Sequence, residues 1–449
     1  MYNVGLISLG CEKNRVDAEI LLSKIDSCER YNVVYEFSEA DIIIVNTCGF
    51  IEDAKRESIE EILKVVSLKE DKKSRLKYVI STGCLAQRYK EELLKEIPEL
   101  DGVIGIGCNS DIVSLLDKVT EDNKICKFDN KLNMPLYGNR ILTTPSHYAY
   151  LKVADGCDNR CTYCAIPLIR GRFRSRSIEN ILEEANKLSK EGVKELLVIA
   201  QDVTRYGEDI YGKPSLAKLL KELCKVEGIK WIRLLYCYPD RIDDELINLI
   251  AKEDKILKYI DVPLQHCSEK ILKSMNRLGS FDSLSKLMFK IRNKIPGVKI
   301  RTTFICGFPG ETDLEFEELV RFVNECRFER MGCFKYSNEE DTPAFNMKNQ
   351  VDEDIKLSRC DILIREQERI MEDYSRLQVG KVIKVIVDGF DEEQNMWVGR
   401  SEADSPDVDG RIYFSSDGDI DVCVGRFIYV EITSYDQCDL IGKAFKICK

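Results

Sequence analysis

The first hundred residues alternate short apolar runs with amphipathic segments. The apolar runs are VGLISLG ending at Gly10, DIIIVNT ending at Thr47, KYVISTG ending at Gly83 and GVIGIG ending at Gly107. Between them, helical periodicity is present in DAEILLSKI, around residues 54–66 and in EELLKEI. Strands that alternate with helices are typical of a doubly wound parallel sheet. We therefore expect an N-terminal α/β domain over residues 1–127.

A second strand–helix series follows a linker. The linker is predicted at residues 128–145, which are richer in Pro, Gly and Asn. Strands are then expected at YAYLKVA, ELLVIAQD, WIRLLYCY, KYIDVPLQ, VKIRTTFICG and RMGCFKYS, before a charged helix near residues 352–375. Strand–helix units with crossover-length spacing indicate a partial or complete parallel (β/α) barrel, here over residues 146–376.

The pattern changes again near residue 380. Short runs such as KVIKVIVDG, MWVGRS, GRIYFS and RFIYVEIT alternate with turn residues. This pattern predicts a small antiparallel β-barrel over residues 377–449. The expected fold class is thus α/β, with a doubly wound sheet, a central (β/α) barrel and a C-terminal β-barrel.

Composition narrows the functional classes. No stretch approaches the roughly 18 apolar residues of a membrane span, and MYNVGLISLGCEKN lacks the features of a secretory signal. We expect a cytoplasmic protein that does not engage a membrane. In such a protein, 19 cysteines point to metal or redox chemistry rather than disulfides. The net charge of −11 argues against general attraction to nucleic acid.

Three cysteines form the most specific motif in the chain. Cys157, Cys161 and Cys164 are spaced CxxxCxxC in ADGCDNRCTYCAIP, just after a predicted strand. Thiolates are the preferred ligands of iron–sulfur clusters, and three of them leave one iron of a four-iron cluster open for a small molecule. The alternative, a structural zinc knot, needs a fourth Cys or His nearby, and none follows within 40 residues.

Each predicted N-terminal strand is also followed at once by a cysteine. These residues are Cys11, Cys48, Cys84 and Cys108. The carboxyl ends of parallel strands share one edge of a sheet, where ligands bind, so the cysteines are expected to converge. The alternative is that each is a small buried apolar residue.

The chain resembles the radical SAM methylthiotransferases over essentially its whole length. CxxxCxxC is the signature of the radical SAM superfamily, whose cluster binds and cleaves S-adenosylmethionine (SAM). SLGCEKNRVDAE, VNTCGFIEDAKRESI and STGCLAQRY are similar to the family's N-terminal domain, and the C-terminal module is similar to a TRAM domain. The resemblance implies two 4Fe-4S clusters, with metal ligands Cys11, Cys48 and Cys84 in one and the catalytic Cys157, Cys161 and Cys164 in the other. Cys108 matches no ligand of the family and is expected to be a bystander.

Other strand ends are expected to line the SAM pocket, as the resemblance implies. The residues assigned to cofactor binding are Gln201, Asp202, Gln265, Gly307 and Glu311. His266 fits either this pocket or a purely structural role. The basic run RGRFRSR, residues 170–176, is expected to be a solvated face, or else to hold carboxylates of SAM or of the target aspartate.

The resemblance leaves two substrates open. Family members attach CH₃S either to a tRNA adenosine or to the β-carbon of an aspartate in ribosomal protein uS12. SLGCEKN, HYAYLKVADGCDNRC and PLQHCSEKIL resemble the uS12 branch, whereas the tRNA enzymes more usually carry GCQMN and a PVQSGS-like segment. From residue 380 onward, 14 Asp/Glu stand against 8 Lys/Arg, a net of −6. Since RNA affinity depends on basic residues, this acidity favours the protein substrate. A monomer is expected, with flavodoxin or ferredoxin as electron donor.

Overall fold

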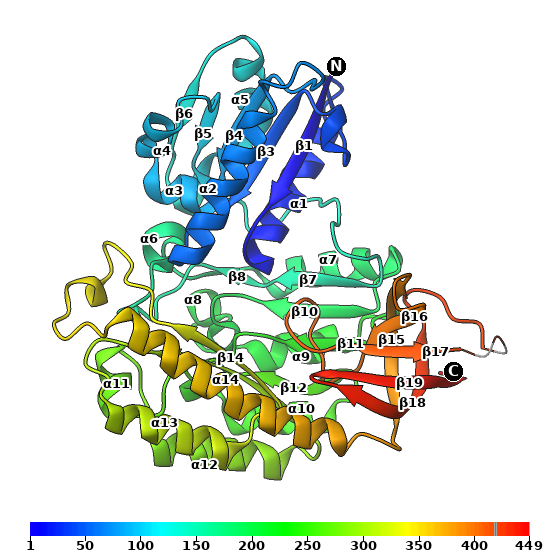
Figure 1. The fold of residues 1–449 in the computed structure, drawn as a ribbon. Coiled ribbons are helices and arrows are strands. Elements are labelled where there is room, and N and C mark those ends of the chain that lie inside the picture. The colour runs from blue at the N-terminus through cyan, green and yellow to red at the C-terminus, as the bar shows by residue number, and fades with distance from the viewer. Residues whose placement is uncertain (417, 419, 449) are drawn as a thin grey trace.

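The N-terminal sheet is built from the apolar runs of the first hundred residues (Figure 1). This computed structural model describes residues 1–416, 418 and 420–448. The strands are β1 (Tyr2–Ser8), β2 (Tyr31–Val33), β3 (Ile42–Thr47), β4 (Tyr78–Thr82), β5 (Gly102–Ile104) and β6 (Ile125–Lys127). They pair in parallel in the order β2-β1-β3-β4-β5-β6. The predicted parallel sheet is confirmed.

Helices cover both faces of this sheet. They are α1 (Glu12–Asp26), α2 (Glu52–Ser67), α3 (Gly83–Tyr89), α4 (Glu91–Glu96) and α5 (Ile112–Thr120). Ile42 of β3 belongs to the same core as Leu115 of α5, whereas the next residue, Ile43, belongs to the core that contains Ile62 of α2. Consecutive strand residues point to opposite faces, and every residue of β3 is buried, so this strand is covered on both sides.

The central domain is an open parallel sheet. Its strands are β7 (Tyr148–Lys152), β10 (Glu195–Ile199), β11 (Trp231–Leu234), β12 (Ile256–Asp261), β13 (Lys299–Cys306) and β14 (Arg330–Lys335). The order is β14-β13-β12-β11-β10-β7, and β7 and β14 are not paired with each other. The expected (β/α) barrel is therefore a partial one. A separate antiparallel pair, β8 (Ala154–Asp155) and β9 (Arg174–Ser175), flanks the CxxxCxxC loop.

Helices pack on one face of this sheet, and the other domains pack on the opposite face. The helices of this domain are α6 (Ile166–Arg170), α7 (Ile178–Lys190), α8 (Glu208–Tyr211), α9 (Leu216–Leu223), α10 (Asp244–Lys252), α11 (Glu269–Ser274), α12 (Phe281–Lys294), α13 (Asp313–Cys326) and α14 (Glu353–Arg376). On the opposite face, Tyr150 and Trp231 share a core with Ile20 of α1 and with Ile386 of the C-terminal module. Both terminal domains thus help to cover this face.

The C-terminal module is a closed five-stranded barrel (orange to red in Figure 1). Its strands are β15 (Val382–Asp391), β16 (Met396–Arg400), β17 (Ile412–Ser415), β18 (Phe427–Asp436) and β19 (Asp439–Ile447). The prediction of an antiparallel barrel needs one correction, because β17 and β19 are parallel. In a closed barrel with an odd number of strands, at least one pair of neighbouring strands must run parallel. Residues 417, 419 and 449 of the predicted domain lie outside the described residues.

Ion pairs dock this barrel onto the central domain. The carboxylate of Glu195, fully buried in β10, accepts hydrogen bonds from Arg233 and from Arg400 of β16, both at 2.8 Å. Arg330 of β14 donates to Asp404 at 2.5 Å. Asp404, one of the acidic residues of the module, is therefore engaged in docking and is not free to attract a partner.

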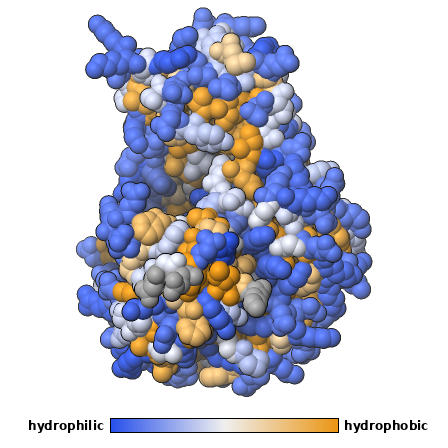
Figure 2. Space-filling view, turned by 90° about the vertical axis from the view of Figure 1, so that its right-hand side faces the viewer, coloured by the Kyte–Doolittle hydropathy of each residue, from blue (hydrophilic) through white to orange (hydrophobic). Residues whose placement is uncertain are grey.

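The molecular surface is predominantly polar where Figure 2 shows it. Hydrophilic residues cover most of that face, and hydrophobic residues gather in a strip on its upper part, which is the N-terminal domain. Within the part of the chain that the structure describes, no helix is both long and apolar enough to cross a membrane.

Candidate paired cluster site

Three of the four strand-end cysteines converge at one edge of the N-terminal sheet. Cys11 immediately precedes α1, Cys48 follows β3 directly, and Cys84 is the second residue of α3. Burial raises the pKa of Cys48 to about 12, and the nearby thiols of Cys84 and then Cys11 add to this effect. The three thiols are therefore close enough for their charges to interact.

Glycines make this convergence possible. Gly10 has φ +81°, and a Cβ there would lie 2.6 Å from the Cβ of Cys48. Gly83 has φ +92°, and a Cβ there would lie 2.5 Å from the carbonyl oxygen of Thr47. Only glycine adopts such a conformation without steric cost at such close approach. The amide of Asn14 adds a further tie, because it donates to the carbonyls of Leu9 at 2.7 Å and Thr47 at 3.2 Å.

The fourth strand-end cysteine is bonded elsewhere. The thiol of Cys108 donates to the carbonyl of Lys127 at 3.5 Å and accepts from the backbone N–H of Asp129 at 3.2 Å. It is fully buried among apolar residues of the N-terminal core. This environment is that of a packed cysteine, and its bystander role stays a prediction.

The CxxxCxxC loop lies between β8 and α6 and is anchored to the C-terminal end of α11. Thr162 donates through its backbone N–H to the carbonyl of Met275 at 3.0 Å and through its hydroxyl to that of Ser274 at 2.8 Å. Burial raises the pKa of Cys157 to about 11, although a bond from the backbone N–H of Asn159 opposes this rise. These hydrogen bonds to backbone carbonyls thus hold the loop in place.

Positive charge and a hydroxyl approach one thiol of this loop. The Sγ of Cys161 lies 3.9 Å from a guanidinium nitrogen of Arg277 and 3.7 Å from the hydroxyl of Tyr238. The guanidinium of Arg277 also stacks over the ring of Tyr238 at 4.1 Å. Donors near cysteine sulfurs stabilise negative charge on them and tune the reduction potential of a cluster.

A buried arginine links the helix that follows the CxxxCxxC loop to the N-terminal domain beside Cys84. Arg170, at the end of α6, pairs with Asp17 of α1 at 2.9 Å and with Asp155 of β8 at 3.0 Å. The same guanidinium lies 3.5 Å from the Sγ of Cys84. Lys152 completes the network through ion pairs to both aspartates. Two carboxylates are therefore balanced by two cations at the domain interface.

This network corrects the expectation of a solvated face for residues 170–176. Arg170 and Arg176 are buried, and only Arg172 of the four arginines is exposed. Arg176 donates to the carbonyl of Lys152 at 2.7 Å. The guanidinium groups are buried because acidic groups from other segments pair with them, a circumstance that the local sequence does not reveal.

Two predicted SAM-pocket residues lie beside the cluster loop. Gln201 donates to Asp155 at 2.8 Å, and its Oε1 is buried without a partner. Asp202 accepts from the side chain of Asn159, within the CxxxCxxC loop, at 2.8 Å. It also pairs with Arg241 at 3.3 Å. Asp202 thus positions the loop, and a direct contact with SAM stays a prediction.

The other predicted SAM-pocket residues follow β12 and β13. Both carboxylate oxygens of Glu311 accept from the backbone N–H of Gly307 at 3.0 Å, and Arg359 of α14 donates to one of them at 2.7 Å. Nε2 of His266 lies 3.4 Å from the same carboxylate. Gln265 has φ +70° and bridges to β13. Their roles toward SAM stay predictions.

Sequence reasoning missed a set of contacts between α1 and the central sheet. Glu12 accepts from the hydroxyl of Tyr236 at 2.7 Å, and the ammonium of Lys13 lies 3.2 Å from the centre of the Tyr236 ring. The backbone N–H of Tyr236 donates to Asp261 at 2.8 Å, and burial raises the pKa of Asp261. In the sequence, the only indication of these contacts was the charged pair Glu12 and Lys13 directly after Cys11, and the spacing of these residues did not indicate a function.

The geometry suits clusters better than single ions at these six cysteines. Among the described residues, only one group of three metal-binding side chains has all its ligand atoms within 4.8 Å, and that group contains none of the six. Ligands of one ion must lie close together, whereas a cubane binds each cysteine through a different iron. The wider triads, with cationic or polar donors near Cys84 and Cys161, fit four-iron clusters.

Comparisons with known proteins agree with this geometry. Residues 151–323 match the radical SAM superfamily, residues 3–105 match uncharacterized protein family UPF0004, and residues 379–445 match the TRAM domain. A ribosomal protein uS12 methylthiotransferase RimO from Thermoanaerobacter sp. (strain X514) is 48% identical over 444 residues, which cover 99% of this chain and 100% of that protein. The chain belongs to the RimO family.

Other members of the RimO family match equally broadly. The protein of that name from Clostridium botulinum (strain Eklund 17B / Type B) is 48% identical, with 98% of each chain covered. The one from Clostridioides difficile (strain 630) is 45% identical, again with 98% of each chain covered. Radical SAM enzymes use SAM and a 4Fe-4S cluster, and the RimO family carries two such clusters.

Solved structures support the fold alone. The radical SAM methyltransferase TsrM from Kitasatospora setae superposes with a TM-score of 0.52 at 14% identity, over 74% of this chain and 73% of that one. The cobalamin-dependent radical SAM enzyme OxsB gives a TM-score of 0.50 at 14% identity, over 83% of this chain and 56% of that one. At such identity the likeness is one of architecture.

Proposed function

We propose that this chain attaches a methylthio group to the β-carbon of an aspartate in ribosomal protein uS12. The observation that carries the proposal is the pairing of two cysteine triads across one buried contact. Cys84 packs against Ala165 and Ile169, which directly follow the CxxxCxxC loop, and Arg170 spans from this helix to Cys84. Two centres held this close are suited to a reaction in which one supplies a radical and the other supplies sulfur.

This pairing supports the ligand assignment. We propose that Cys11, Cys48 and Cys84 hold one 4Fe-4S cluster, and that Cys157, Cys161 and Cys164 hold the other, within domains at 1–127, 146–376 and 377–449 joined by a linker at 128–145. The second cluster, when bound, supplies the electron that cleaves SAM. The protein contributes Arg170 near one triad and Arg277 near the other, each of which stabilises negative charge at sulfur.

SAM is proposed to bind at the strand ends next to the CxxxCxxC loop. The unpartnered Oε1 of Gln201 is the clearest support, since a buried acceptor without a donor is costly and suits a ligand amino or hydroxyl group. Asp202, Gln265, Gly307 and Glu311 are assigned to the same pocket. Of these, Glu311 acts through the backbone of Gly307, which its carboxylate holds.

The substrate is tested by direct mass measurement. The reconstituted enzyme, SAM and a reductant are incubated under anaerobic conditions with uS12 or with tRNA. We expect uS12 to gain about 46 Da, the mass of CH₂S, at one aspartate. A gain on tRNA and none on uS12 would replace this proposal with tRNA adenosine methylthiolation.

Three cysteine variants separate the two centres. Cys157→Ala is expected to abolish SAM cleavage and to leave about four irons, the content of one cubane cluster. Cys84→Ala is expected to keep SAM cleavage and to lose methylthiolation. Cys108→Ala is the matched control, because its thiol bonds only to backbone groups outside the two triads, and it should behave like the unaltered protein. Methylthiolation by the Cys84 variant would contradict the assignment.

Flavodoxin or ferredoxin is the proposed electron donor. A pocket of about 240 Å³ beside Cys157 is lined by the cations Lys131, Arg160 and Arg172, with Asp158 as its only acidic residue. A cationic patch next to the cluster loop suits an acidic redox partner, because complementary charge steers association. We also propose that the chain acts as a monomer in the cytoplasm; sedimentation at several concentrations and cell fractionation test these two points.

A further inference from the structure

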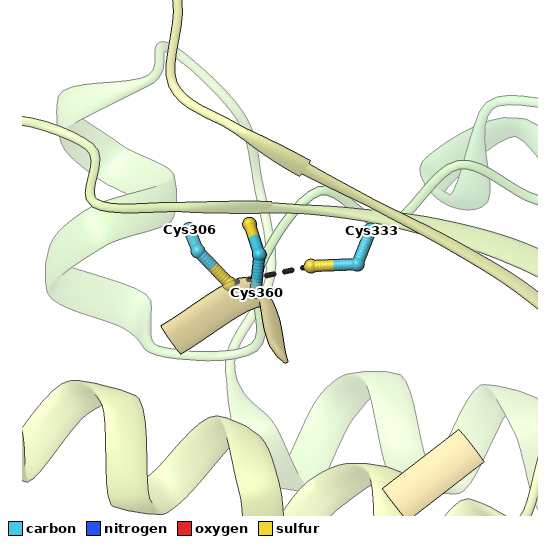
Figure 3. Close-up of side chains that lie close together, drawn as sticks. All are labelled: Cys306, Cys333 and Cys360. Atoms are coloured by element: carbon cyan, nitrogen blue, oxygen red, sulfur yellow. Dashed lines mark hydrogen bonds between the residues drawn. The ribbon is translucent and has the colours of Figure 1, made fainter. Parts of the chain in front are cut away.

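A third group of cysteines lies in the central domain, away from the two triads. Cys306 ends β13, Cys333 lies in β14 and Cys360 lies in α14. Their side chains lie close together (Figure 3), and all three Sγ atoms lie within 4.8 Å of each other. The Sγ atoms of Cys306 and Cys333 are 3.5 Å apart. No step of the proposed reaction uses these residues.

The spacing of the three sulfurs fits one metal ion. A zinc–sulfur bond is about 2.3 Å long, so two sulfurs on one ion are separated by at most about 4.6 Å, and by less in trigonal or tetrahedral geometry. The observed separations are within reach of this range after small side-chain shifts. A four-iron cluster attaches each cysteine to a different iron and needs wider spacing, such as that of the two ligand triads proposed above.

The three cysteines are largely shielded from solvent. Cys306 is fully buried, Cys360 is nearly so and Cys333 is half-buried. Three sulfur atoms that lie this close together in a buried space offer the ligands that soft metal ions prefer.

The alternative roles fit less well. Simple apolar packing needs no thiol, and here three polarisable sulfurs meet at one point rather than facing separate neighbours. A disulfide between Cys306 and Cys333 requires the sulfurs to close from 3.5 Å to about 2.05 Å, and also requires an oxidant. Sulfur-rich sites select soft ions over Mg²⁺ or Ca²⁺.

We propose that Cys306, Cys333 and Cys360 form a mononuclear binding site for a soft, thiol-seeking cation of the Zn²⁺ or Cu⁺ class. On binding, each cysteine that is still protonated releases its proton to solvent and forms a metal–sulfur bond, without change in oxidation state. With Zn²⁺, a water molecule reaching the half-buried Cys333 side completes four-fold coordination.

Such an ion would clamp α14 onto the ends of two central strands. This contact is already tight, because a Cβ on Gly307 would lie 2.2 Å from the Cγ of Lys356, one turn before Cys360. Arg359, next to Cys360, binds Glu311 at 2.7 Å. The metal would therefore help to fix the loop that contains Gly307 and Glu311, two residues assigned to the proposed SAM pocket. The expected role is structural.

The test uses protein in which both proposed clusters are already assembled, so that the other six ligand cysteines are occupied. Zn²⁺ or Cu⁺ is added anaerobically, excess is removed by a weak chelator and desalting, and metals are counted by mass spectrometry. We expect one of the two ions to remain at about one equivalent per chain, the capacity of a mononuclear site. The iron content should not change.

Variants at the triad identify the ligands. Cys333→Ala and Cys360→Ala should each lower the affinity for that ion more than about tenfold, the least that even a supporting residue contributes to metal binding. Cys326→Ala, at a buried cysteine of α13 outside the triad, is the matched control and should bind normally. Co²⁺ offers a second readout, because thiolate-to-cobalt absorption should be present in the unaltered protein and absent from the triad variants.

Three results would overturn the proposal. They are retention of neither ion by the unaltered protein, equal binding by the triad variants, or a mass lower by two hydrogens that maps to a Cys306–Cys333 disulfide in protein that binds no metal.

Discussion

Replacement of Arg170 by methionine tests the contact that joins the two domains. The guanidinium is 1% exposed and lies 2.9 Å from Asp17 and 3.0 Å from Asp155. Methionine has a similar length but no charge, so Lys152 alone would have to balance both carboxylates. Removal of one partner from a buried ion pair costs about 3–5 kcal/mol, because it leaves an uncompensated charge.

This loss of folding stability is expected to appear as a lower melting temperature. For a domain of about 150–250 residues, 1 kcal/mol corresponds to about 2–4 °C, so Arg170→Met should lower the melting temperature by roughly 6–20 °C at pH 7. Differential scanning calorimetry of the protein with and without iron measures the shift. Arg172→Met, at the exposed arginine two residues later, is the matched control and should change the temperature little.

The effect should also depend on pH. Burial alone would raise the pKa of Asp155, but Arg170 and then Lys152 hold it well below its ordinary value. This stabilisation is fully present above the unfolded-state pKa of about 3.9 and is lost as the pH falls toward the folded-state pKa. In the variant, the pKa of Asp155 rises, so protonation relieves the buried charge at a higher pH. The difference between the two proteins should therefore narrow from pH 7 toward pH 4.

A charge-balanced double variant completes this test. Asp155→Asn combined with Arg170→Met leaves one carboxylate and one ammonium group, and it should recover part of the lost melting temperature. An Arg170→Met protein that melts within about 2 °C of the unaltered one, or a difference that does not change with pH, would refute the reasoning, since 1 kcal/mol already corresponds to that shift.

Two further substitutions test the local geometry. Gly10→Ala places a Cβ 2.6 Å from that of Cys48 at φ +81°, which costs at least about 1–2 kcal/mol. We therefore expect the iron bound by this variant to fall toward the content of one cluster. A full iron content in a colorimetric assay would contradict this expectation. Arg330→Leu leaves the buried Asp404 without its ion-pair partner and should destabilise the docked C-terminal barrel by about 3–5 kcal/mol. Limited proteolysis should then release residues 377–449. Resistance to the protease equal to that of the unaltered protein would count against the role of the pair.

The elements that sequence periodicity predicted are those with long buried strands. β3 and β10 are recognisable because parallel strands covered on both faces consist largely of consecutive apolar residues. β2 and β6 have three residues each, and β19 carries Asp439, Lys443 and Lys446 among its apolar residues. Such strands are defined by their neighbours in the sheet, so the sequence alone offered no comparable signal for them.

The residues of the candidate site likewise include some that the sequence predicted and some that it did not. Cysteines at strand ends were predictable, because strand ends are identifiable and parallel topology brings them together. Arg170 was not, because its burial depends on Asp17 and Asp155, which come from two different domains. The triad of Cys306, Cys333 and Cys360 joins three separate elements and has no local spacing that reveals it.

The acidity of the C-terminal module has a different meaning in the folded protein. Asp404 pairs with Arg330, and Asp409 accepts from the hydroxyl of Tyr259 at 2.7 Å, so these carboxylates face the central domain. A net charge counted along the sequence assigns them to the surface. Charge alone therefore does not choose between a protein and an RNA substrate, and it is membership of the RimO family that favours uS12.

The domain interface must hold two cysteine triads close together without admitting water, and its charges explain how. A purely apolar contact would leave the thiolates near Cys84 without any compensating positive charge. One terminal nitrogen of Arg170 supplies that charge, while the other terminal nitrogen pairs with both Asp17 and Asp155, so the cation itself is not left unpaired. A lysine has one compact ammonium group and lacks the planar fork that reaches several acceptors at fixed angles. The same guanidinium thus holds the two domains together and also stabilises negative charge beside Cys84. A substitution that weakens the domain interface is therefore expected to alter the proposed cluster there as well.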